Sequence, residues 1–79
     1  MTPADVKKGV GLAIRQLRDK AGITGDDLAH AMSMTRTAVV QWEHGRNCPP
    51  LTKLPRLADA LGTSPVRLLA LAMRLGGAK

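Results

Sequence analysis

Histidine and cysteine, the side chains that commonly serve as general bases, thiol nucleophiles and metal ligands, are few in this sequence. They are His30, His44 and Cys48, and His30 falls in a predicted helix away from the segment that holds the other two. Nucleophilic catalysis needs a nucleophile beside a base and a group that orients the base, and a zinc site needs four ligands. His44 and Cys48 supply neither set, so the sequence predicts no enzyme, no metal site and no cofactor.

The cationic side chains indicate a different chemistry, which is recognition of an anion. The 79 residues include twelve Lys and Arg against six Asp and Glu, a net charge of +6. This balance favours nucleic acid or acidic lipid as a partner. Trp42 is the only aromatic residue, whereas proteins that bind unpaired bases need several aromatic platforms. Binding to single strands is therefore disfavoured.

Length and composition predict one small globular domain over residues 1–79. Hydrophobic residues make up 44% of the chain, which is typical of a folding sequence. Cys48 has no second cysteine to pair with, which favours a reducing compartment. The start MTPADVKKG lacks the apolar core expected of a signal peptide, and the sequence has no apolar run of the ~18 residues that a membrane span requires. We therefore expect a cytoplasmic protein.

Capping residues and the spacing of apolar residues predict five helices and no strand. The first helix begins after Thr2 and ends at Gly22, and Gly9 and Gly11 are expected to weaken it. Its apolar face consists of Val10, Ile14, Leu17 and Ala21.

The second and third helices are short and nearly continuous. Thr24 is the expected cap of the second, and Thr35 caps a third helix of about ten residues, ~15 Å long, that ends at Gly45. Ser33 lies in the turn between them. The side chains expected to pack inward are Leu28, Ala29, Met32, Val39 and Trp42.

A loop with two prolines separates these helices from a fourth, in which Thr52 is the expected cap and Pro55 lies in the first turn. The fifth helix follows Ser64 and runs from Val66 to Leu75. It carries more apolar residues than one buried face requires. Leu68, Leu71 and Leu75 share one face, and Val66, Leu69 and Met73 share another.

We expect one face of this fifth helix to pack on the fourth helix and the other to form a symmetric dimer. The interface is assigned to Leu68, Leu71 and Leu75. If each subunit reads duplex DNA with one helix, such a dimer would place the two reading helices about 34 Å apart, one turn of DNA, and its target would be an inverted repeat. The alternative is a monomer that dimerises only on DNA.

Two short helices joined by a turn of three or four residues are typical of a helix-turn-helix. From Val10 to about Leu69 the sequence resembles the Cro/C1-type (XRE-like) repressor family of phages and bacteria. The matching stretches are IRQLRDKAGIT, DDLAHAM, MTRTAVVQWEHGRN and LPRLADALGTSPVRLL. The resemblance implies an all-α, lambda-repressor-like fold with its helix-turn-helix at about residues 24–45, in a protein encoded by a bacterium or a phage.

Two residues depart from the family pattern. Gly25 stands where relatives usually have a glutamine that touches phosphate, and Ser33 replaces the common glycine of the turn. A positive φ at Ser33 would cost about 1 kcal/mol.

The resemblance also implies which residues face the bases. They are Arg36, Thr37 and Gln41, and Asn47 matches a further base or phosphate contact. The side-chain chemistry agrees, because arginine donates two hydrogen bonds to guanine, glutamine pairs with adenine, and threonine offers a hydroxyl and a methyl group.

Phosphate contacts position a protein on DNA without reading its sequence. The candidates for these contacts are Thr24, Thr35, His44, Arg46, Thr52 and Lys53. Arg18 and Glu43 correspond to a pair that bridges the first and third helices in relatives. Four other cations, Lys7, Lys8, Arg67 and Arg74, are expected to form solvated surface.

The expected function is therefore sequence-specific binding of double-stranded DNA by a transcriptional repressor, as a homodimer at least on its operator. The alternative is an antitoxin, or another protein-interaction module, that also regulates its own promoter and holds a toxin or other protein. A third possibility, a membrane-surface helix at Val66 to Leu75, has only Arg67 and Arg74 as basic residues.

Overall fold

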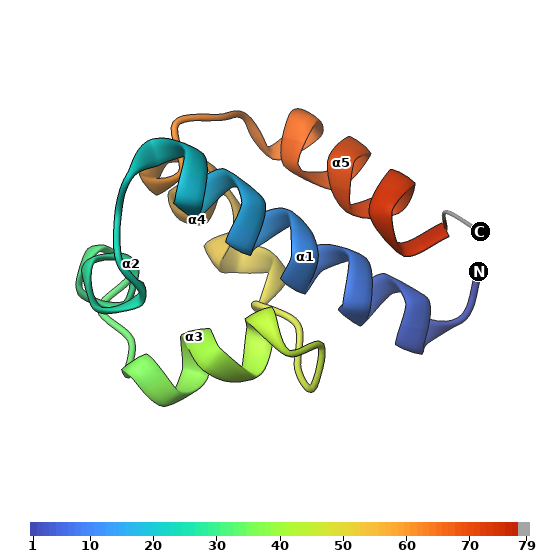
Figure 1. Ribbon diagram of the computed structural model, residues 1–79, viewed down its shortest axis with the longest axis horizontal. Coiled ribbons are helices and arrows are strands. Elements are labelled where there is room, and N and C mark those ends of the chain that lie inside the picture. The colour runs from blue at the N-terminus through green and yellow to red at the C-terminus, as the bar shows by residue number, and fades with distance from the viewer. Residues whose placement is uncertain (78–79) are drawn as a thin grey trace.

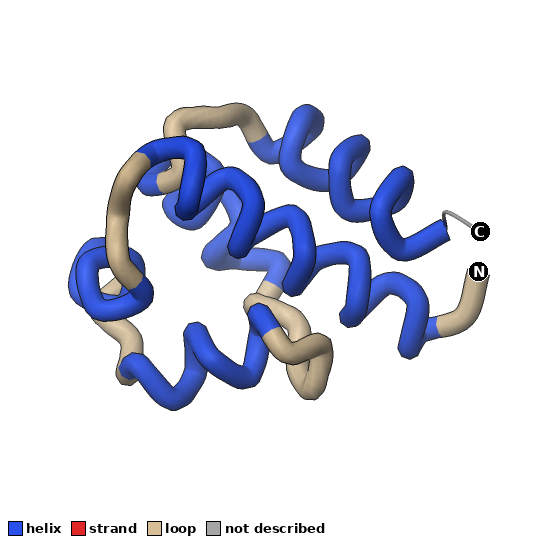
Figure 2. Tube along the Cα trace, viewed as in Figure 1, coloured by secondary structure: helices blue, strands red, loops and turns tan. Residues whose placement is uncertain are grey.

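The computed structural model describes residues 1–77. The helices, in order, are α1 (Pro3–Ala21), α2 (Gly25–Ala31), α3 (Arg36–Glu43), the 3-10 turn η1 (Leu51–Lys53), α4 (Leu54–Ala60) and α5 (Pro65–Gly77). In Figure 1, α1 runs through the middle of the fold with α5 along one side and α3 on the other. The described residues form helices and loops without any strand (Figure 2), so the all-α, five-helix prediction is confirmed.

Threonine side chains begin the first three helices. Thr2 and Thr24 each form a reciprocal capping box, in which Asp5 and Asp27 accept hydrogen bonds from the backbone N–H of the threonine at 2.9 Å. These backbone hydrogen bonds lower the pKa of both aspartates from the ordinary value. The capping boxes therefore stabilise the fold fully at pH values above the usual pKa range of carboxyl groups. This stabilisation is lost as the pH falls through the lowered pKa values of the two aspartates.

The start of α4 differs from the prediction for Thr52. The backbone N–H of Lys53 donates to the carbonyl oxygen of Pro50 at 2.9 Å, which folds Thr52 into η1. A capping side chain needs extended backbone at the cap position, whereas the residue before α4 is Lys53, in helical geometry and with no side-chain hydrogen bond. Thr52 is thus not a cap, and Pro55 does occupy the first turn of α4.

Gly9 and Gly11 lie where α1 meets its two neighbours. The helix continues through both glycines. A Cβ atom on Gly9 would collide with the carbonyl oxygen of Ala72 in α5, and one on Gly11 would collide with that of Trp42 in α3. The two glycines thus allow backbone-to-backbone packing on opposite sides of α1, a role that helix propensity does not reveal.

The core lies between α1 and the four other α-helices. All the inward-facing residues predicted for α2 and α3 are buried, and Trp42 is 3% exposed. The buried side chains are Val10, Ala13, Ile14, Leu28, Ala29, Met32, Val39, Trp42, Leu57, Ala58, Leu61, Leu68 and Ala72. On the predicted apolar face of α1, Leu17 is partly buried, whereas Ala21, at the last position of the helix, is exposed.

α5 packs mainly along α1 rather than on α4. Leu68 is 1% exposed and belongs to the core, so its assignment to a dimer interface is wrong. The reason is the geometry of α5, which turns Leu68 and Ala72 toward α1 and leaves Leu71 and Leu75 half-buried at the edge of that contact. The apolar residues left exposed are Val66, Leu69 and Met73. We call these three residues the apolar stripe.

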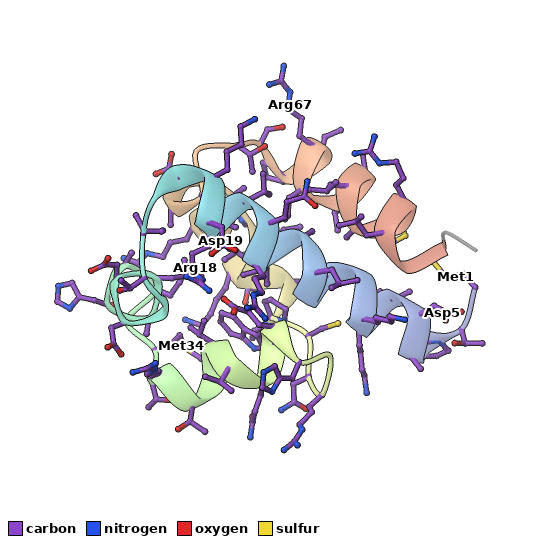
Figure 3. All side chains as sticks on the ribbon, in the orientation of Figure 1. Met1, Asp5, Arg18, Asp19, Met34 and Arg67 are labelled. Carbon is purple, nitrogen blue, oxygen red and sulfur yellow. The ribbon has the colours of Figure 1, made fainter. Side chains whose placement is uncertain are left out.

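An ion pair joins α1 to the end of α3, as expected from the family resemblance. Arg18 donates from Nε to one carboxylate oxygen of Glu43 at 2.8 Å and from Nη2 to the other at 3.3 Å. Its Nη1 donates to the carbonyl oxygen of Ile23 at 3.0 Å. Arg18 therefore ties three segments together in the space between α1, α2 and α3 (Figure 3), and the hydrogen bond with Glu43 raises the pKa of the guanidinium.

Glu43→Gln should lower the free energy of unfolding by about 1.5–3 kcal/mol, because the half-buried Arg18 would lose its charged acceptor. Asp26→Asn is the matched control, since it removes the carboxylate of an ion pair whose side chains are 67–68% exposed, and should cost less than about 1 kcal/mol. Urea unfolding followed by Trp42 fluorescence measures both. Equal losses would show that the pair with Arg18 is no stronger than a surface contact.

Ser33 has a φ of 54°, in the left-handed region that disfavours side chains. Ser33→Gly should therefore raise the free energy of unfolding by about 0.5–1 kcal/mol. This gain is the conformational penalty of a left-handed residue with a Cβ atom, minus the extra entropic cost of ordering a glycine. Ser33→Ala keeps the Cβ atom and should bring no gain. A glycine variant no more stable than the alanine variant in urea unfolding would contradict this account.

Candidate nucleic-acid interface

α2 and α3 form a helix-turn-helix whose turn is held by backbone hydrogen bonds. The N–H of Ser33 donates to His30 at 3.1 Å, and that of Met34 donates to Ala29 at 2.9 Å. Thr35 then caps α3, accepting from the N–H of Ala38 at 3.1 Å. Because these bonds leave the turn little freedom, the direction of α3 is set by how α2 packs.

The buried face of α3 determines which side chains face solvent. Val39 and Trp42 point into the core, so the opposite side of the helix faces solvent. Arg36 and Thr37 are exposed and Gln41 is half-buried. The structure thus brings the three residues expected to read bases onto the side of α3 that faces away from the core.

Sequence reasoning missed Val40, which lies on the same side of α3 and is 40% exposed. It comes four residues after Arg36 and four before the exposed His44, which places all three on one helical stripe. This four-residue spacing is the feature of the sequence that could have placed Val40 on the exposed side of α3. Val40 is an exposed apolar side chain among polar ones, suited to contact a methyl group.

Asn47 and Gln41 interact directly. The side-chain amide of Asn47 donates to Oε1 of Gln41 at 2.8 Å, and the N–H of Arg46 donates to the backbone carbonyl of Gln41 at 3.0 Å. The loop after α3 is thereby attached to the helix. The amide donor of Gln41 stays available, while its oxygen is oriented by Asn47.

A carboxylate lies beside Arg36. Nη1 of Arg36 is 3.3 Å from Oδ2 of Asp26, in the first turn of α2, and both side chains are about two-thirds exposed. This contact links the starts of the two helices, and its exposure makes it weak enough to exchange for another partner of Arg36.

The side chains expected at phosphates lie at helix ends and in the loops after α3. The hydroxyl oxygens of Thr24 and Thr35 accept the capping hydrogen bonds, so their O–H groups remain available as donors, whereas the backbone N–H of Thr24 is already bound by Asp27. Lys53 is half-buried. The exposed members are Thr24, Thr35, His44, Arg46 and Thr52.

Lys8 is a further cation near this surface. The position of a Cβ on Gly45, in the turn that ends α3, is 3.2 Å from the Cα atom of Lys8. The exposed Lys8 thus lies next to the loop of Arg46 rather than on a remote surface. No pattern in the sequence indicates this proximity, because it arises from the crossing of α1 and α3.

Within residues 1–77, no three His, Cys, Asp or Glu side chains gather closely enough to hold a metal ion. Cys48 is exposed and unpaired with any cysteine. No helix of this part of the chain combines the length and the apolar character needed to cross a membrane.

Comparison with known proteins agrees with this geometry. Residues 14–68 match the model of the helix-turn-helix family. A relative from Methanothermobacter thermautotrophicus, described as an uncharacterized HTH-type transcriptional regulator, is 39% identical over 49 residues, which cover 62% of this chain and 71% of the relative.

Two crystal structures of the clp gene regulator ClgR from Corynebacterium glutamicum are also similar. One superposes with a TM-score of 0.85 at 26% identity, covering 91% of this chain and 77% of ClgR. The other has a TM-score of 0.83 at 27% identity, covering 89% of this chain and 90% of that ClgR chain. The chain belongs to the Cro/C1-type helix-turn-helix family, a family of DNA-binding transcription regulators and not of enzymes.

Proposed function

We propose that this protein represses transcription by binding a specific duplex DNA sequence as a dimer, with α3 in the major groove. The observation that carries the proposal is the solvent-facing side of α3, which presents Arg36, Thr37 and Gln41 opposite the buried Val39 and Trp42. Eight residues of helix span about 12 Å, and the major groove is about 12 Å wide. The net charge of +6 favours approach to DNA.

Each exposed side chain of α3 has a matching base chemistry. Arg36 would exchange its weak contact with Asp26 for the two acceptors of a guanine, and Thr37 would offer a hydroxyl. Gln41, oriented by Asn47, would donate its free amide hydrogens to a neighbouring base edge. Val40 would contact the methyl group of a thymine.

Contacts with phosphates would surround this reading helix. The donors proposed are the hydroxyl groups of Thr24 and Thr35, the backbone amide of Thr35, and the side chains of His44, Arg46, Thr52 and Lys53. Lys8 joins them because it lies beside the loop after α3. Glu43 does not oppose this arrangement, since its carboxylate is neutralised by Arg18.

Dimerisation would use the apolar stripe. Val66 is 77% exposed, Leu69 39% and Met73 37%, and all three lie on one flank of α5. Beside Leu69, a small apolar hollow of about 180 Å³ is lined by side chains that include Val6, Leu51 and Leu54. A second copy would cover the stripe, and the two reading helices would then meet an inverted repeat.

Arg36→Ala should weaken binding to the selected duplex by about 1–3 kcal/mol and relax the preference at one base pair, because a bidentate contact is lost. Lys53→Ala should instead weaken binding to the selected and to random DNA alike. It should also reduce the slope of log affinity against log salt concentration by about the contribution of one phosphate contact. The duplex is first selected from a random pool, and affinities are then measured by fluorescence anisotropy over a range of salt.

Arg15→Ala is the control, because Arg15 is an exposed cation of α1 assigned to no DNA contact. An Arg36→Ala variant that loses equal affinity for selected and random duplexes would remove Arg36 from the base-reading set.

Leu69→Arg should reduce the dimer fraction and the affinity for an inverted repeat, since a charge would be buried in the stripe. Leu12→Arg is the matched control, because Leu12 is 40% exposed on α1, outside the stripe. Sedimentation velocity with and without the duplex measures both. A Leu69→Arg protein that dimerises normally would refute the stripe as the interface, and dimer loss in Leu12→Arg would place the interface on the Leu75 side of α5.

A further inference from the structure

A second surface, on the far side of α1 from α3, has the chemistry of a binding site. It is an open groove of about 560 Å³ between the C-terminal part of α1, the turn after α4 and α5. Leu17, Leu61 and Leu71 provide apolar lining, and Lys20, Arg67 and Arg74 provide cations. We call this site the basic groove.

The charge of the basic groove is uncompensated. No aspartate or glutamate lines it. Among residues 1–77 the ion pairs join Arg18 to Asp19 and Glu43, and Arg36 to Asp26, so none includes Lys20, Arg67 or Arg74. A site lined by three cations and apolar side chains is complementary to a ligand that carries both carboxylates and apolar side chains.

The basic groove is separate from the surfaces assigned to DNA and to the dimer. α1 lies between α5 and α3, and Arg67 points outward on the side of the molecule away from α3 (Figure 3). Along α5, Arg67, Leu71 and Arg74 follow at four- and three-residue steps and share one flank. The apolar stripe occupies the other flank, so a partner in the basic groove would leave both proposed contacts open.

We propose that the basic groove docks a short acidic, amphipathic segment of another protein. Its apolar side chains would rest on Leu17, Leu61 and Leu71, and its carboxylates would pair with Lys20, Arg67 and Arg74. The volume is typical of a site that encloses a few side chains rather than a whole domain. A second copy of this chain, with its own net charge of +6, is repelled by such a groove, and a flat bilayer does not reach into a concave site.

The test titrates the isotope-labelled full chain with a synthetic helical peptide of glutamate and leucine, and follows backbone amide shifts by NMR. Saturable shifts are expected at Lys20, Arg67 and Leu71 but not at Arg36 and Thr37. The matched peptide with glutamine in place of glutamate should bind at least about tenfold more weakly, which is 1.4 kcal/mol. Neither measurement involves DNA, so failure here is distinct from failure of the proposed function.

The double variant Arg67→Glu, Arg74→Glu should lower the affinity for the glutamate peptide by about tenfold or more. The control Arg15→Glu reverses a charge outside the basic groove and should change this affinity by less than about threefold. All three positions are exposed, so thermal melts should show that both variants remain folded. Equal losses in the two variants would mean general charge attraction and would overturn the proposal.

Four other results would also overturn it. They are absence of peptide binding, equal affinity for the glutamine peptide, binding of phosphatidylserine vesicles in place of the peptide, and a loss of operator affinity in the double variant well beyond that in Arg15→Glu. A double variant whose dimer fraction falls in sedimentation would identify the occupant as a second copy and would likewise refute the acidic partner.

Discussion

The close approach of backbones at Gly9 and Gly11 is the constraint on which the rest of the fold depends. These residues are two apart on α1, and each lies directly against a carbonyl oxygen of a different neighbour, α5 for one and α3 for the other. Any side chain at either position would push a helix away by the thickness of a methyl group or more. Because interiors are close-packed, such a shift would open the core around Ile14, which is fully buried.

The same approach fixes the orientation of α3. Trp42 meets α1 through its carbonyl oxygen and buries its ring, and the adjacent Glu43 reaches Arg18. Two consecutive residues of α3 thus attach its C-terminal end to α1, while Thr35 and the left-handed Ser33 attach its start to α2. A helix of eight residues is too short to be stable alone. Its polar face is therefore positioned by tertiary contacts and not by its own propensity.

Electrostatics then distinguish the outer surfaces. The half-buried acid Glu43 is paired with Arg18, and the capping aspartates of α1 and α2 are occupied by backbone N–H groups. Most of the unpaired charge in residues 1–77 is consequently positive, both near α3 and along the basic groove. α1 separates these two cationic regions and gives the molecule two faces that need not compete for one ligand.

The sequence by itself determined the local features of this protein. The threonine caps of α1, α2 and α3, the apolar spacing of α2 and α3, and the left-handed turns at Gly22 and Gly45 depend on residues close along the chain. The same local signals carry the family resemblance, and with it the face of α3 that holds Arg36, Thr37 and Gln41. They indicate which side chains of a helix point inward without indicating what lies opposite.

Only the tertiary structure decided the contacts between segments distant in sequence. It turned Leu68 into the core because α5 lies along α1, and it converted Gly9 and Gly11 from weak points of a helix into sites of close packing. It also placed Lys8 beside the loop after α3, Asp26 beside Arg36, and Lys20 in the same groove as Arg67 and Arg74. The physical reason is that helix crossing angles and distances follow from the packing of many side chains and backbones together, which no local pattern specifies.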